Sequence, residues 1–126
     1  MRKIYTIFLD DKRIGTTRLE YADPPMGTVF GQANFLDLGS VYKFFKDYCT
    51  KNNIEFTDYP DDKLIQTRTI PNLKVVDDEG IEIKGQGNQI SGMDSNLYEL
   101  TIEAIPYPFF GEQFSHHVKE YQERRQ

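Results

Sequence analysis

The chain has 126 residues and a formal net charge of −5, and 38% of it is hydrophobic and 28% charged. This length suits one domain, and a content of 13% Phe and Tyr argues against disorder because such side chains need burial. An acidic chain lacks the basic surface that nucleic-acid binding requires, and no apolar run reaches the length of a membrane span. We therefore expect neither a nucleic acid nor a membrane as partner.

The first third of the chain predicts a β-hairpin followed by a stiff corner. Residues 4–9 are β-branched and aromatic, residues 10–13 form a polar turn, and residues 14–20 can return antiparallel. Pro24 and Pro25 then remove backbone donors, and Gly27 releases the chain into a short strand over residues 28–35. We expect this corner to present Met26 and Phe30 to the core.

Residues 40–53 predict the clearest helix. Ser40 can cap it, and apolar residues recur every three or four positions along one face. Asn52 and Asn53 supply a left-handed stop. The apolar face comprises Val41, Phe44, Phe45, Tyr48 and Cys49.

The second half of the chain alternates strands with polar turns. We expect a polar loop over residues 58–62, strands over 64–70, 73–76 and 81–84, and a four-residue hairpin turn over 77–80. Residues 85–92 contain three glycines and read as a loose loop or an irregular, exposed sheet edge. Residues 98–105 alternate apolar and polar and predict a half-exposed strand, and residues 110–122 predict a terminal helix.

These elements predict an α+β fold in a single domain spanning residues 1–126. A mainly antiparallel sheet is packed by one amphipathic helix, with a short C-terminal helix at the end. The lone Cys49 cannot form an internal disulfide and favours a reducing, cytoplasmic setting.

Four residues near the C-terminus could carry metal chemistry. Glu112, His116 and Glu120 stand four apart and would share a helical face, with His117 beside them. They match neither of the usual metalloprotease helix motifs, and the chain holds no further histidine. A surface helix with local charged contacts is the simpler interpretation, so we expect no cofactor.

Other catalytic arrangements have less support. Cys49 lies on the apolar helix face, where a thiol is usually a small buried hydrophobe, although pairing with His116 or His117 stays open. Gly85, Gly87 and Gly92 miss the spacings of phosphate-binding loops. We expect no catalytic residue and no enzyme activity.

Acidic clusters are the main candidate for recognition. Mixtures of acids with an aromatic residue suit contacts with a cationic protein, although turns also recruit Asp for local geometry. The predicted partner-binding residues are Asp58, Tyr59, Asp61, Asp62, Asp77, Asp78 and Glu79.

Three segments carry a resemblance to a known class of protein. Residues 7–17, residues 22–27 and residues 105–110 with Phe114, His116 and His117 are similar to small bacterial immunity proteins of contact-dependent and polymorphic toxin systems. The resemblance implies a non-enzymatic protein that binds and neutralises a cognate toxin domain, and the acidic loops suit a basic, nuclease-type toxin. The alternatives are a small metal-binding protein or enzyme using the Glu/His helix, and an accessory assembly protein of a phage or mobile element.

Overall fold

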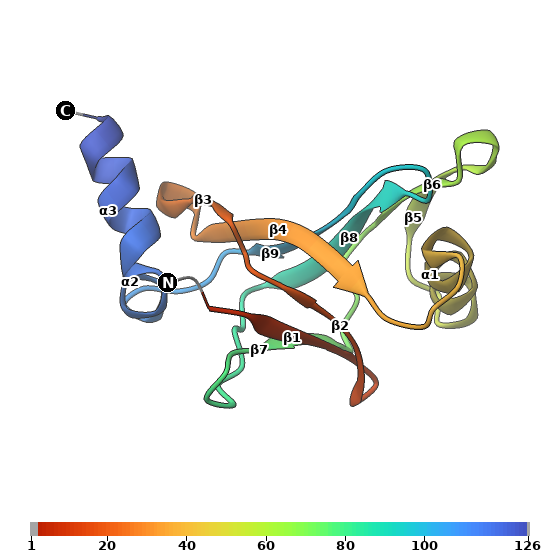
Figure 1. The fold of residues 1–126 in the computed structure, drawn as a ribbon, viewed down its shortest axis with the longest axis horizontal. Helices are drawn as coiled ribbons and strands as arrows, with labels where there is room; N and C mark the ends of the chain where they lie inside the picture. Colours follow the sequence, from red (N-terminus) through yellow and green to blue (C-terminus); the bar gives the residue numbers. More distant parts are fainter. Residues whose placement is uncertain (1–2, 126) are drawn as a thin grey trace.

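Nine strands form one antiparallel sheet in the computed structural model, which describes residues 3–125 (Figure 1). Their order is β5-β6-β8-β9-β4-β2-β1-β7, and β3 pairs with the first residues of β4, on the edge whose last residues pair with β2. The strands are β1 (Tyr5–Leu9), β2 (Lys12–Thr17), β3 (Tyr21–Asp23), β4 (Thr28–Phe35), β5 (Phe56–Tyr59), β6 (Leu64–Thr67), β7 (Leu73–Val76), β8 (Gly87–Met93) and β9 (Tyr98–Glu103). The helices are α1 (Val41–Lys51), α2 (Phe109–Gln113) and α3 (Ser115–Arg124), and η1 (Pro24–Met26) and η2 (Pro60–Asp62) are single 3₁₀ turns. The predicted α+β class is confirmed.

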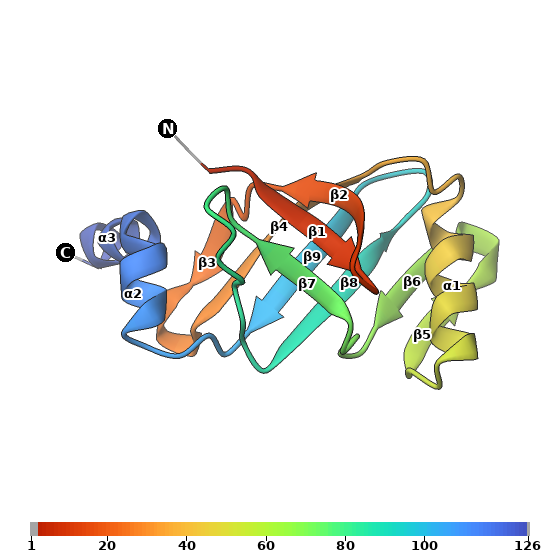
Figure 2. The ribbon, with the colours of Figure 1, turned by 90° about the horizontal axis from the view of Figure 1, so that it is seen from below.

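The sheet is strongly curved, so that β7, at one end of the strand order, comes next to the start of β8. The backbone N–H of Ile70 donates to the carbonyl of Asn88 over 2.9 Å, and the Asn88 amide donates to the carbonyl of Leu73 over 2.6 Å. Strands β1, β2 and β7 therefore lie across from β4, β9 and β8 (Figure 2). Alternate residues of both layers fill the space between, because successive side chains of a strand point to opposite faces.

Helix α1 extends this core at one end of the molecule. The Ser40 hydroxyl accepts from the N–H of Lys43 over 3.1 Å, which caps the helix as predicted, and Asn53 provides the left-handed stop with φ 55°. Phe45 and Cys49 are fully buried against β5, β6 and β8. Tyr42 is buried as well, which the apolar periodicity did not indicate.

Helices α2 and α3 close the opposite end. The predicted single helix is interrupted at Phe114, whose φ of −120° and ψ of 40° are not helical. Phe110 and Phe114 are fully buried, so the interruption turns two aromatic side chains into the core. Among the described residues, none of the helices combines the length and apolar character that crossing a bilayer requires.

Two predictions for residues 21–31 are wrong in detail. Met26 does not face the core, since its side chain is 67% exposed, and Phe30 is half-buried against Tyr21 on the other side of the sheet. The reason is the period of β4, in which Val29, Gly31 and Ala33 point inward. Pro24 is the buried residue of the corner.

Residues 85–92 are also not a loose edge. Residues 87–92 belong to β8, which pairs with β6 on one side and with β9 on the other. Gly92 lies between Ile65 and Tyr98, and Gly87 pairs with Glu103. Gly92 is required there because its φ is 154° and a Cβ atom would lie 2.3 Å from the carbonyl oxygen of Leu97, and a Cβ atom at Gly87 would displace the Thr69 hydroxyl. Residues 58–62 are not a plain loop either, since β5 includes Asp58 and Tyr59.

Candidate functional site

The predicted partner-binding residues fall into two groups far apart. Residues 58–62 lie on β5 and η2 beside α1, and residues 77–79 lie in the turn after β7, where Asp77 contacts α2. Helices α1 and α2 occupy opposite ends of the molecule in both ribbon views (Figures 1 and 2). The sequence-predicted residues therefore do not form one continuous site.

Asp58 is engaged by helix α1. Its carboxylate accepts the Tyr42 hydroxyl and forms an ion pair with Lys46 at 2.9 Å. The hydrogen bond from Tyr42, together with the contacts from Lys46, lowers the pKa of Asp58 below its ordinary value. Asp58 thus joins β5 to α1, and it is only partly available to a partner.

The η2 turn, by contrast, projects into solvent. None of its three residues is buried, and Tyr59 directly before it is 53% exposed. Within residues 3–125, the side chains of Tyr59, Asp61 and Asp62 make no hydrogen bond or ion pair. We call residues 59–63 the acidic tip.

Asp94 ties the base of this tip to the start of α1. Its backbone N–H donates to the Lys63 carbonyl over 3.3 Å, and its carboxylate accepts the N–H of Tyr42 and the hydroxyls of Ser40 and Tyr98. Burial alone would raise the pKa of Asp94, but these hydrogen bonds outweigh burial and lower it. The tip therefore stands on a rigid, charged support.

Asp77 serves the fold at the other end. Only 5% of it is exposed, and its carboxylate accepts the N–H groups of Glu79 and Ile81 and the Gln113 amide, with Lys3 at 3.5 Å. Burial would raise the pKa of Asp77, but the two backbone hydrogen bonds and the contacts with Gln113 and Lys3 lower it overall. It organises its own turn and anchors α2, leaving Asp78 and Glu79 as the exposed acids.

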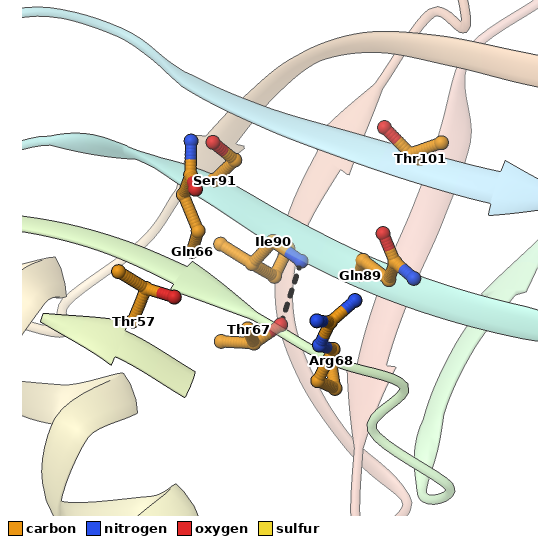
Figure 3. Close-up of a pocket in the computed structure, with 8 residues that line it drawn as sticks. All are labelled: Thr57, Gln66, Thr67, Arg68, Gln89, Ile90, Ser91 and Thr101. Carbon is orange, nitrogen blue, oxygen red and sulfur yellow. Dashed lines mark hydrogen bonds between the residues drawn. The ribbon is translucent and has the colours of Figure 1, made fainter. Parts of the chain in front are cut away.

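A polar groove of about 290 Å³ crosses the face of the sheet that points away from α1 (Figure 3). We call this side the outer face of β5, β6, β8 and β9. The groove is lined on that side by Thr57, Gln66, Arg68, Gln89, Ser91 and Thr101. The strand alternation of residues 64–68 and 98–103 could have indicated it, but reading residues 85–92 as a loop concealed Gln89 and Ser91.

The four C-terminal candidate metal ligands do not gather around one point. The Nε2–H of His117 donates to the buried carbonyl of Leu19 over 2.9 Å, so this nitrogen is engaged by the backbone. Glu112, His116 and Glu120 line a separate cavity of about 430 Å³ together with Lys3 and Tyr5. Among residues 3–125, the one set of three such side chains with ligand atoms within 4.8 Å of one another is Asp77, Asp78 and Glu79.

Cys49 is buried in the core, as predicted. Burial raises the pKa of its thiol to about 11, so the nucleophilic thiolate is scarce at neutral pH.

No protein-family model, curated protein sequence or solved structure matches this chain. The acidic tip and the outer face are thus the two features on which a functional proposal can be built.

Proposed function

We propose that the chain is a non-enzymatic binding module, an immunity protein that binds and neutralises a basic, nuclease-type bacterial toxin in the cytoplasm. The observation that carries this proposal is the acidic tip, where the side chains of Tyr59, Asp61 and Asp62 project with no partner among residues 3–125. In the group at residues 77–79, by contrast, Asp77 is buried, and its carboxylate accepts hydrogen bonds from the backbone of its own turn. We therefore place the contact at the tip.

The chemistry of the tip suits a surface built to bind phosphate. A nuclease holds its substrate backbone with Lys and Arg, and carboxylates on a neighbouring protein can occupy the same positions. The net charge of −5 also accelerates association with a basic partner, with a strong dependence on salt. Tyr59 adds a large and fairly rigid contact of the type enriched at the centres of interfaces. Binding of this kind neutralises an enzyme by covering its active site, without any reaction.

The test begins with the gene directly upstream, which the proposal expects to encode a secreted protein with a basic, toxic C-terminal domain. We expect co-expression of this chain with that C-terminal domain to restore growth, and an equimolar complex to form whose affinity falls steeply with salt. An upstream domain that stays toxic, and does not bind, would overturn the proposal. A closed oligomer that forms without any partner and does not bind that domain would favour the assembly role instead.

The matched variants compare the two acidic groups. Asp61→Asn Asp62→Asn is expected to slow association by about tenfold at low salt, because two steering charges are lost. Asp78→Asn Glu79→Gln removes the same charge from the opposite end and is expected to change association by less than about twofold. Equal effects of the two pairs would contradict placement of the contact at the tip.

A further inference from the structure

The outer face of β5, β6, β8 and β9 is not covered by α1 or by strands β1, β2 and β7. Helix α1 and strands β1, β2 and β7 all lie on the inner side of β8, β9 and β4 (Figure 1). Outward residues such as Gln66, Glu99 and Ser91 are exposed or half-buried, whereas their inward neighbours Ile65 and Leu100 are fully buried. The face runs across six strands in the order β5-β6-β8-β9-β4-β3, or about 24 Å at the usual strand spacing.

Apolar side chains line the edge of this face next to the acidic tip. The register pairs Tyr59 with Leu64 and Leu64 with Met93, so these three side chains stand in a row across β5, β6 and β8. Leu97 directly precedes β9 and is 60% exposed, close to the exposure of Tyr59. The acidic tip is thus continuous with an apolar strip.

Aromatic side chains occupy the far side of the same face. Tyr21 on β3 and Phe30 on β4 stack with ring centroids 5.5 Å apart, and Tyr21 is 57% exposed. Between the two apolar parts lies the polar groove of hydroxyl and amide groups (Figure 3). Surfaces that bind proteins commonly combine apolar contacts with polar groups that can form hydrogen bonds to the partner.

The charge on this face is acidic and unpaired. The ion pairs within residues 3–125 are Lys3–Asp77, Lys43–Asp47, Lys46–Asp58 and Lys74–Asp11, and none lies on the outer face. Asp61 and Asp62 lie at the acidic tip, and Glu99 on β9 pairs with outward-facing Ser91. Lys63 ends the tip, and Arg68 lines the groove.

We propose that the outer face, from the acidic tip to the Tyr21–Phe30 pair, docks the basic toxin domain. This inference rests on the proposed function and specifies its surface. The acids at the tip and on β9 favour a cationic protein. The apolar strip supplies the desolvated contacts that charge alone does not provide. A face about 24 Å wide is of the size needed to hold much of a standard interface, which buries about 800 Å² on each partner.

The central test places an arginine in the middle of this face. Ser91→Arg on β8 adds bulk and a positive charge at a half-buried outward position, and we expect it to weaken binding of the upstream toxin domain by at least 100-fold. The matched control is Thr6→Arg on β1, another half-buried strand position on the opposite layer of the fold. We expect that change to alter affinity by less than threefold. Circular dichroism and thermal melting establish that both variants are folded.

Hydrogen–deuterium exchange of the wild-type complex gives a second measurement that needs no substitution. We expect protection of β6, β8 and the acidic tip, and unchanged exchange in α1 and the turn at residues 77–80. A complex that protects α1 or β1 and β7 instead, or that tolerates Ser91→Arg, would overturn the docking surface while leaving the proposed function standing. Absence of any complex between wild-type chain and toxin domain would overturn both.

Discussion

Two hairpins of this protein contain turns of the same conformation, but only one of these turns is covered by other parts of the chain. In the first, β3 and β4 are joined through η1; in the second, β5 and β6 are joined through η2. The residues that enter the turns, Asp23 and Tyr59, have φ near −120° and ψ of 86° and 87°. Both turns begin with proline and end in a left-handed residue whose N–H returns to the proline carbonyl, over 3.0 Å at Gly27 and 3.1 Å at Lys63.

Their surroundings are opposite. The first turn is covered by the C-terminal segment: Pro24 is buried, the Tyr107 hydroxyl donates to its carbonyl over 2.8 Å, and Ile105 bonds to the backbone of Gly27. The second turn has no buried residue. The two hairpins flank the central β8–β9 pair on opposite sides, so the same local structure meets a covered and an uncovered environment in one sheet.

This difference explains the residues that each turn uses. A Cβ atom at Gly27 would lie 2.6 Å from the carbonyl oxygen of Ile105, so the covered turn needs glycine for space as well as for its φ of 67°. The uncovered turn has room and holds Lys63 at φ 49°. Freed from packing, the second turn can carry the two Asp residues that we assign to recognition.

The largest expected effect comes from exchanging the last residue of each turn. Gly27→Lys places a side chain against the Ile105 backbone and is expected to lower the free energy of unfolding by about 3 kcal/mol or more. Lys63→Gly relieves left-handed strain while making the unfolded chain more flexible, so we expect a change within about 1 kcal/mol. Urea unfolding of both variants measures this. Similar losses in the two variants would show that coverage by the C-terminal segment does not distinguish the turns.

Acid should weaken the support of the second hairpin before that of the first. Asp94 has a lowered pKa in the folded protein, so the stability it contributes is complete above its ordinary value near 3.8. That contribution is lost as the pH falls through the lower folded pKa. Asp94→Asn is expected to cost about 2 kcal/mol near pH 7 and much less at the acidic limit. Unfolding curves across this pH range test it, and a cost independent of pH would refute the role of the carboxylate.

Removing one hydroxyl tests the cover of the first turn more gently. Tyr107→Phe loses the hydrogen bond to the Pro24 carbonyl and is expected to cost about 1 kcal/mol. Tyr59→Phe is the counterpart at the second turn, where the hydroxyl has no internal partner within the described residues, and it should be nearly neutral. Thermal melts of the pair give the comparison. A larger loss for Tyr59→Phe would mean that the tip is held by contacts other than those described.

The smallest effect on stability is expected for the acids of the tip. Asp61→Asn Asp62→Asn should alter the free energy of unfolding by less than about 0.5 kcal/mol, since exposed charges without partners contribute little. The same variant should weaken the salt dependence of toxin binding. A clear loss of stability would assign these residues to the fold and remove the basis for the proposed contact.

Local sequence signals accounted for several elements. The β1–β2 hairpin, helix α1 with its Ser40 cap, and the alternation of β9 all depend on neighbours in sequence, and all were predicted. Three strands were missed. β3 and β5 have only three and four residues, and each is held by a hairpin partner, β4 or β6, while β8 contains two glycines and is held between β6 and β9. Glycine in β8 signals close packing, which a single sequence does not distinguish from a flexible loop.

The candidate site divides in the same way. The sequence by itself determined the acidic charge, the turn chemistry and the alternation of strand faces, because these depend on residue type and spacing. Only the tertiary structure decided that Asp77 is buried while Asp61 and Asp62 are exposed. It also decided that one proline turn is covered and the other is not. Burial is set by which distant segments pack together, here the C-terminal segment onto Pro24 and Gly27, and no local pattern records that choice.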